Sequence, residues 1–379
     1  MNVVVIRLVT NLFLLLLLVL SGCGGGGVTE TATSTSATAE FSVVSAGGDH
    51  TIALKPNGTL WAWGLNASGQ LGDGTANNSY APEQIGTGTN WTAVSAGGNH
   101  TIALKSNGTL WAWGLNNFGQ LGDGTANNSY APEQIGIGTN WTAVSAGGNH
   151  TIALKSDGTL WAWGYNASGQ LGDTTTTNSS SPEQIGTGWA AVSAGGNHTI
   201  ALKSGGTLWA WGLNTSGQLG DGTTANKYAP EQIGTGWAAV SAGGDHTIAL
   251  KSGGTLWAWG YNAWGQLGDT TTTNSSSPEQ IGTGWAAVSA GGDHTIALKS
   301  GGTLWAWGLN TSGQLGDGTA ANSSAPEQIG TGTNWTAVSA GGDHTIALKS
   351  GGTLWAWGLN TFGQLGDGTA NNSYAPEQI

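Results

Sequence analysis

The sequence predicts an all-β fold: a seven-bladed β-propeller of four-stranded antiparallel blades. One module recurs seven times through residues 41–379, and copies start 48 or 50 residues apart. Each module consists of short strand-like segments separated by turns rich in Gly and Asn. A module of this size cannot bury a core alone, so neighbours must stack. Propellers hold four to eight four-stranded blades, and seven modules fit that range.

The middle of each module predicts a β-hairpin. In the first copy, residues 50–55 and 60–64 are apolar strand candidates separated by Asn57-Gly58. Asn-Gly favours a two-residue type I′ turn, in which both central residues need positive φ. Other copies place Asp-Gly or Gly-Gly there, which the same turn accepts.

Two further strands complete the module. Residues 43–46 precede the hairpin, and Gly47-Gly48 permits a tight reversal between them. Residues 82–85 form a short fourth strand, whose proline suits the edge of a sheet. A polar loop over residues 66–81 joins the third and fourth strands.

The third strand has no polar face. Trp61 and Trp63 point to one side, and Leu60 and Ala62 point to the other. A strand that is apolar on both sides must be covered on both sides, as stacked blades would do. We therefore interpret Trp61, Trp63 and their copies as structural repeat residues that fill the space between blades. An aromatic ligand-binding strip is the alternative for the tryptophans, and a parallel β-helix is the alternative fold.

The ends of the repeat region predict how the ring closes. The repeat begins at Phe41 without a preceding Pro-Glu-Gln-Ile segment, and residues 376–379 are such a segment with no strand after them. We expect this last strand to supply a missing edge of the first blade, so that N- and C-terminal strands close the ring and leave no open edge.

The first forty residues predict export and anchoring. Residues 1–22 combine Arg7 with an apolar run too short for a comfortable membrane span, as in a signal peptide. Leu20-Ser21-Gly22-Cys23 resembles the bacterial lipoprotein box, which predicts a lipidated Cys23. Residues 23–40 would be a flexible tether rich in Gly, Ser and Thr. The expected location is the bacterial cell envelope, lipid-anchored at the outer membrane or cell surface. An ordinary secretory signal is the alternative.

The charge pattern excludes nucleic acid as a partner. The formal net charge is -12, and the chain has one arginine. The lysines are dispersed at about one per module, whereas phosphate neutralisation needs clustered basic residues.

The module resembles the regulator of chromosome condensation repeat family. The segment from Trp63 to Gly72, with Pro82 and residues 96–104 after it, carries the resemblance, which recurs through residues 41–379. The resemblance implies a seven-bladed propeller. The founding member is a nuclear exchange factor for the GTPase Ran that acts through a wedge-like insertion. This chain has no such insertion, so no GTPase partner is expected. A secreted β-lactamase inhibitor with this type of propeller binds through aromatics on one rim, which suggests a mode of binding here.

We predict that the recurring polar residues have structural roles and take no part in catalysis or metal binding. One histidine per module follows the Gly-Gly pair, and we expect its imidazole to tie that turn to the backbone; the seven are His50, His100, His150, His198, His246, His294 and His344. A metal site needs three or four converging ligands. Calcium loops need a Glu twelve residues along, which the segment after Asp73 lacks. We therefore predict no metal, no cofactor and no catalytic residues, because seven copies of one environment do not separate the pKa values of an acid and a base.

The positions at which modules differ predict the functional surface. All lie in or beside the long loop, and several are aromatic, the residue type enriched at interfaces: Phe118, Trp264, Phe362, Tyr80, Tyr130, Tyr228, Tyr374, Tyr165 and Tyr261. The predicted function is a surface-anchored, non-enzymatic scaffold that binds an unknown protein or envelope component through one loop rim. Drift in tolerant loops, a cell-wall or glycan-binding module, and an exported hydrolase with a site at the channel mouth are the alternatives.

Overall fold

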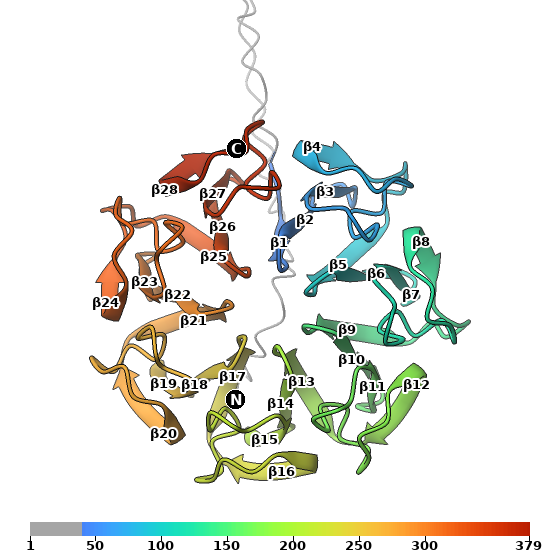
Figure 1. Ribbon diagram of the computed structural model, residues 1–379, viewed down its shortest axis with the longest axis horizontal. Coiled ribbons are helices and arrows are strands. Elements are labelled where there is room, and N and C mark those ends of the chain that lie inside the picture. Colours follow the sequence, from blue (N-terminus) through green and yellow to red (C-terminus); the bar gives the residue numbers. More distant parts are fainter. Residues whose placement is uncertain (1–39) are drawn as a thin grey trace, which may run out of the picture.

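The computed structural model describes residues 40–379, which form a ring of seven blades around a central axis (Figure 1). All elements of regular secondary structure in this part of the chain are β-strands. Each blade is a four-stranded antiparallel sheet of four consecutive strands. The predicted fold class is confirmed.

The strands of a blade run from the channel to the perimeter in chain order (Figure 1). The innermost are β1 (Val43–Ala46), β5 (Trp91–Ala96), β9 (Trp141–Ala146), β13 (Trp189–Ala194), β17 (Trp237–Ala242), β21 (Trp285–Ala290) and β25 (Trp335–Ala340). The second are β2 (His50–Leu54), β6 (His100–Lys105), β10 (His150–Lys155), β14 (His198–Lys203), β18 (His246–Lys251), β22 (His294–Lys299) and β26 (His344–Lys349). The third are β3 (Leu60–Gly64), β7 (Leu110–Gly114), β11 (Leu160–Gly164), β15 (Thr207–Gly212), β19 (Thr255–Gly260), β23 (Leu304–Gly308) and β27 (Leu354–Gly358). The outermost are β4 (Ser79–Gln84), β8 (Ser129–Gln134), β12 (Ser179–Gly186), β16 (Lys227–Gly234), β20 (Ser275–Gly282), β24 (Ser323–Gln328) and β28 (Ser373–Gln378).

Because neighbouring strands are antiparallel, the connections alternate between two faces of the ring. The long-loop face carries the Gly-Gly turn between the first and second strands and the long loop between the third and fourth, residues 47–49 and 65–78 in the first blade. The hairpin face carries the hairpin turn and the connection to the next blade, residues 55–59 and 85–90 in the first blade.

The predicted hairpin forms, but its turn is longer than a type I′ turn. The Gly58 amide donates to the Lys55 carbonyl over 2.9 Å, and the Lys55 amide donates to the Thr59 carbonyl over 3.1 Å. In the turn of the first blade only Gly58 has a positive φ, 77°, so Asn57 does not adopt the left-handed conformation that a type I′ turn requires of it. In the blades with Gly-Gly both glycines have positive φ, for example 99° at Gly205 and 79° at Gly206. A three-residue loop that ends in a left-handed glycine satisfies the hairpin instead.

The hydrophobic core lies between blades. Trp113 is fully buried and packs in one cluster with Ile52 and Leu60 of the preceding blade. Trp91 meets Trp111 edge to face at 5.7 Å between ring centroids, a favourable aromatic geometry. The same cluster recurs at all seven boundaries between blades, with Phe41 in place of the inner-strand tryptophan in the first blade. Each blade is thus covered on both faces.

The expected closure by the last strand is wrong. β28 pairs with β27 of its own blade through Trp355↔Gln378, and the first blade already has an outer strand of its own, β4. The first blade therefore has no missing edge. The ring is closed by packing between the first and last blades: the Gly342 amide donates to the Gly47 carbonyl over 3.0 Å, and the Ala46 amide donates to Ser339 Oγ over 2.9 Å.

Candidate functional site

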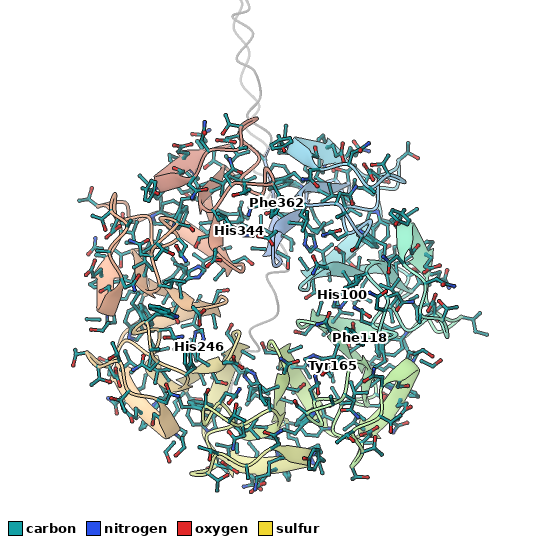
Figure 2. The ribbon with its side chains drawn as sticks, viewed as in Figure 1. His100, Phe118, Tyr165, His246, His344 and Phe362 are labelled. Carbon is teal, nitrogen blue, oxygen red and sulfur yellow. The ribbon has the colours of Figure 1, made fainter. Side chains whose placement is uncertain are left out.

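The histidines form a buried ring of hydrogen bonds between blades. His50 Nε2 lies 3.0 Å from Oγ1 of Thr101 in the next blade, and that hydroxyl donates to the Gln70 carbonyl over 2.9 Å. Trp113 Nε1 donates to the same carbonyl over 2.9 Å. The arrangement recurs around the ring and ends with His344 on Thr51 at 3.1 Å. Figure 2 shows His100, His246 and His344 at equivalent places in three blades. The imidazole therefore contacts a side chain of the next blade, and its Nδ1 has no hydrogen-bond partner, so the expectation that it ties the Gly-Gly turn to the backbone is wrong.

This geometry keeps the histidines neutral. The single hydroxyl proton of Thr101 goes to the Gln70 carbonyl, so His50 must donate from Nε2. Burial, followed by the neighbouring imidazoles of His100 and His344, lowers the pKa of His50 to about 3. Burial alone lowers the pKa of His100 to about 4. A fully buried histidine that donates to a threonine has no access to a substrate or a metal.

Among the residues that the structure describes, those lining the central channel carry no reactive side chains. Its cavity of about 110 Å³ is lined by the Ala-Gly-Gly segments of the seven blades, such as Ala46, Gly47 and Gly48. A Cβ on Gly47 would lie 2.5 Å from the His50 ring, so glycine is needed where the turn crosses the imidazole. Within residues 40–379, no group of three His, Cys, Asp or Glu side chains could hold a metal ion.

Four adjacent blades carry carboxylates above the histidine ring. Asp49, Asp245, Asp293 and Asp343 occupy the position at which the other three blades have asparagine. Gln266 Nε2 donates to Asp293 Oδ1 over 2.9 Å, as Gln70 Nε2 does to Asn99 over 3.2 Å. Burial, with the neighbouring charges of Asp343 and Asp245, raises the pKa of Asp293 to about 6. Burial of these carboxylates and repulsion among them therefore destabilise one sector of the long-loop face at neutral pH.

Asparagine side chains make the long loops rigid. Asn66 Oδ1 accepts from the Leu71 amide over 2.9 Å, and Asn66 Nδ2 donates to Asp73 Oδ1 over 2.9 Å. The Asp73 carboxylate accepts in turn from the Thr75 amide and hydroxyl. The rim residues that follow the asparagine therefore stand on a fixed framework.

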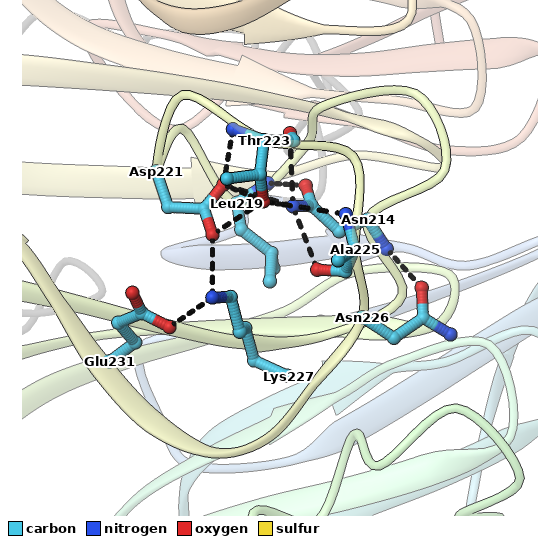
Figure 3. Close-up of polar contacts among 8 residues, drawn as sticks. All are labelled: Asn214, Leu219, Asp221, Thr223, Ala225, Asn226, Lys227 and Glu231. Carbon is cyan, nitrogen blue, oxygen red and sulfur yellow. Dashed lines mark hydrogen bonds and ion pairs between the residues drawn. The ribbon is translucent and has the colours of Figure 1, made fainter.

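The fourth blade adds an ion pair to this framework. Lys227 replaces the serine found at Ser79, and its ammonium lies 3.2 Å from Asp221 and 2.7 Å from Glu231 (Figure 3). Hydrogen bonds to Glu231 and Asp221 raise the pKa of Lys227. This blade alone, among residues 40–379, contains a salt bridge.

The predicted rim aromatics all lie on the long-loop face, but they form no single patch. Phe118 and Tyr165 come from adjacent blades and pack with ring centroids 4.8 Å apart (Figure 2). Trp264 is 41% exposed, whereas Phe362 and Tyr261 are only partly exposed. The four tyrosines on outer strands are about two-fifths exposed and lie nearer the perimeter: Tyr80, Tyr130, Tyr228 and Tyr374.

One exposed apolar residue escaped the sequence reasoning. Ile137 is 95% exposed in the connection between the second and third blades, on the hairpin face. Other modules have Gly-Thr-Gly where this one has Gly-Ile-Gly, so comparison of the modules at that position could have found it.

The fold and the repeated polar ring define a class of protein, the RCC1-like propellers. The RCC1-like domain matches residues 21–346, and the regulator of chromosome condensation (RCC1) repeat matches residues 335–364 and 351–379. The chain belongs to this family.

Solved structures agree with that assignment at the level of the fold. Human WBSCR16 is 23% identical, with a TM-score of 0.76 over 85% of this chain and 93% of that chain. Prp20p from Saccharomyces cerevisiae is 24% identical, with a TM-score of 0.73 over 81% of this chain and 82% of that chain. Yeast RCC1 (Prp20), in a structure with Kap60, is 19% identical, with a TM-score of 0.77 over 96% and 91%.

The anchoring predictions concern residues that the structure does not describe. The signal peptide, Cys23 and the tether lie outside the described residues. Within residues 40–379, no helix has the length and hydrophobicity needed to cross a membrane.

Proposed function

We propose that this protein is a non-enzymatic scaffold that binds a protein partner through its long-loop face. The proposal includes export, and anchoring to the bacterial envelope by lipid on Cys23. A propeller of this family is compatible with a protein-binding scaffold. The observation that carries the proposal is the presence of exposed aromatics on loops held by buried asparagine side chains.

The exposed aromatics suit a binding surface. Phe118 and Trp264 are 36% and 41% exposed, and each precedes a fully buried glutamine two residues on, Gln120 and Gln266, which accepts its amide hydrogen. Rigid aromatic side chains lose little conformational entropy on binding and are typical interface anchors. The polar ring beneath them is occupied by contacts between blades, so binding without bond chemistry is the function that these residues support best.

Relatives support binding as a general role, but their partners do not carry over to this chain. The structure of Prp20p is described with its binding properties to Gsp1p and histones. We do not propose a GTPase or histones here, because the chain is acidic, with a net charge of -12, and its modules carry no insertion.

A glycan is the second candidate ligand, because an exposed indole is a stacking platform for a sugar ring. Trp264, Phe118 and Phe362 would form that platform. A glycan array and a pulldown from envelope extracts separate the two candidates.

The test is crosslinking from the rim in living cells, followed by mass spectrometry. A photoreactive residue at Phe118 or Trp264 should capture one protein reproducibly, whereas the same residue at Thr92 on an inner strand should not. The triple variant Phe118→Ser, Trp264→Ser and Phe362→Ser should lose that partner. Undiminished binding by this variant would refute the proposed surface. Loss of membrane association in Cys23→Ala tests the anchor separately.

A further inference from the structure

The hairpin face differs between two parts of the ring. Three blade-to-blade connections contain Thr-Asn before the inner-strand tryptophan, as in residues 88–91. The connections into the fourth, fifth and sixth blades lack this pair, as in Gly188-Trp189. The three shortened connections are consecutive, so any gap that they leave is continuous across three blades.

The missing pair occupies space elsewhere in the ring. In the first blade, a Cβ on Gly58 would lie 2.3 Å from the Thr89 carbonyl oxygen, so Thr89 packs directly on the preceding hairpin. The carbonyl of Asn90 accepts from the Ser106 amide over 2.8 Å. Without these residues, Gly206 of the fourth blade faces the Trp237 backbone instead.

A groove of about 830 Å³ lies where the connections are short, within the range typical of ligand sites. It runs over the fourth, fifth and sixth blades. Its lining is mostly Ala, Gly and Leu, with Trp237 and Trp285 in the wall and Lys203 and Lys251 beside them.

The indole N–H groups around this groove lack acceptors. In the first blade, Trp61 Nε1 donates to Thr59 Oγ1 over 3.0 Å. Among residues 40–379, the third-strand indoles of the fourth and fifth blades, Trp209 and Trp257, are buried donors without this acceptor. The inner-strand indoles of Trp189, Trp237 and Trp285 are also buried without a partner. Of these, Trp237 and Trp285 line the groove and are only 5% and 4% exposed. Buried donors without acceptors are costly, so each of them calls for a structural explanation.

Lysines give the groove a positive edge in an acidic protein. Lys203 Nζ lies 4.5 Å from the Trp209 ring centroid, and Lys251 Nζ lies 4.4 Å from that of Trp257. No carboxylate lines the groove. A ligand with negative charges would meet these ammonium groups without repulsion.

We propose that this groove binds an extended acidic peptide segment with small apolar side chains. Its carboxylates would pair with Lys203 and Lys251, and its apolar side chains would pack on the Ala and Leu lining. A peptide fits better than an acidic glycan, because Trp237 and Trp285 expose too little ring for a sugar to stack on. This site is on the face opposite the rim aromatics and does not depend on the proposed function.

The test is fluorescence anisotropy of the full chain with a short labelled peptide of alternating Glu and Val. We expect saturable binding that weakens with salt, and no binding of the matched Gln and Val peptide. Lys251→Gln should weaken binding about tenfold, as expected for one charged hydrogen bond. Lys349→Gln removes the equivalent lysine from the seventh blade and should leave the affinity unchanged.

A second variant fills the groove without removing any group. Inserting Thr-Asn before Trp189, Trp237 and Trp285 copies the loops of the other blades and should abolish binding while the ring stays folded by circular dichroism. Three results would overturn the proposal: equal binding of the Gln and Val peptide, an equal loss of affinity with Lys349→Gln, or binding that survives the insertions. Binding of oligogalacturonate in place of the acidic peptide would overturn the choice of a peptide.

Discussion

The buried ring and the exposed rim lie only a few residues apart in the sequence, yet they differ in how strictly they repeat. The His-Thr-Gln-Trp hydrogen bonds are the same in all seven blades. The position two residues before the buried glutamine is Ser in four blades, Phe in two and Trp in one. The difference shows that the buried hydrogen bonds between blades are kept identical, whereas most of the variation falls on side chains at the surface. The following predictions test that division.

Acid should unfold the ring through its histidines. Their pKa values in the folded state, about 3 to 4, lie below the ordinary 6.5, so only the unfolded chain takes up protons as the pH falls. Stability should therefore fall from about pH 6.5 down to about pH 3, with seven groups contributing. Urea unfolding followed by tryptophan fluorescence across this range measures the effect. The carboxylates with raised pKa values act in the opposite direction but are fewer and half-exposed. Constant stability between pH 7 and pH 4 would contradict a neutral buried ring.

Trp211→Ala should give the largest loss from a single side chain. Trp211 is fully buried, packs against Ile152 and Leu160 of the preceding blade, and donates to the Gln170 carbonyl over 3.0 Å. We expect a loss of about 3–5 kcal/mol in the free energy of unfolding. Chemical denaturation measures it.

Thr101→Val should cost about 1–3 kcal/mol, because it leaves His50 Nε2 without an acceptor in a buried place. Valine keeps the shape of threonine, so packing should not change. Thr92→Val is the matched control: Thr92 is exposed, and its loss should stay within about 0.5 kcal/mol. Equal effects of the two variants would show that the ring of hydrogen bonds contributes nothing specific.

Asp293→Asn should stabilise the protein at pH 7. The raised pKa, about 6, means that the ionised carboxylate is disfavoured in the folded state, and asparagine occupies the same position in the second blade with the same glutamine contact. After allowance for solvent screening, the gain should be about 1 kcal/mol or less. It should shrink as the pH falls through 6 toward 3.8, where the native aspartate becomes protonated anyway. Thermal melts of both proteins at pH 7 and pH 4 give this comparison.

Trp264→Ser should have the smallest effect on stability. The indole is exposed on the rim, so the change should stay within about 0.5 kcal/mol. Partner capture should nonetheless fall. A large loss of stability would place Trp264 with the structural tryptophans and remove it from the binding surface.

The sequence was sufficient for the fold because its signals were local and repeated. The Gly-Gly turn, the hairpin and the two-sided Trp strand each required a definite structure, and seven copies required a ring. Closure was mispredicted because the missing segment before Phe41 suggested a shared blade, whereas pairing of Trp61 with Gln84 makes the first blade complete.

The sites were harder to predict for a physical reason. His50 and Thr101 are 51 residues apart in the sequence, and their contact depends on how one blade is offset against the next, which no local pattern encodes. The groove on the hairpin face forms because three connections lack the Thr-Asn pair. Missing residues give no sequence motif from which a groove could be predicted. Comparison of the modules does show that the Thr-Asn pair is missing from three of them. Only the structure of the stacked blades shows that this pair packs on the preceding hairpin.

Because each blade is a complete sheet, the interfaces between blades do little to set the order of the blades around the ring. Within residues 40–379 no strand is exchanged between neighbours, and the contact that joins the last blade to the first repeats the contacts at the other boundaries. Little in the interface therefore distinguishes one neighbour from another, and covalent connection must set the sequence of blades. New termini placed in any hairpin turn, with the present ends joined by a linker, should still give a closed ring.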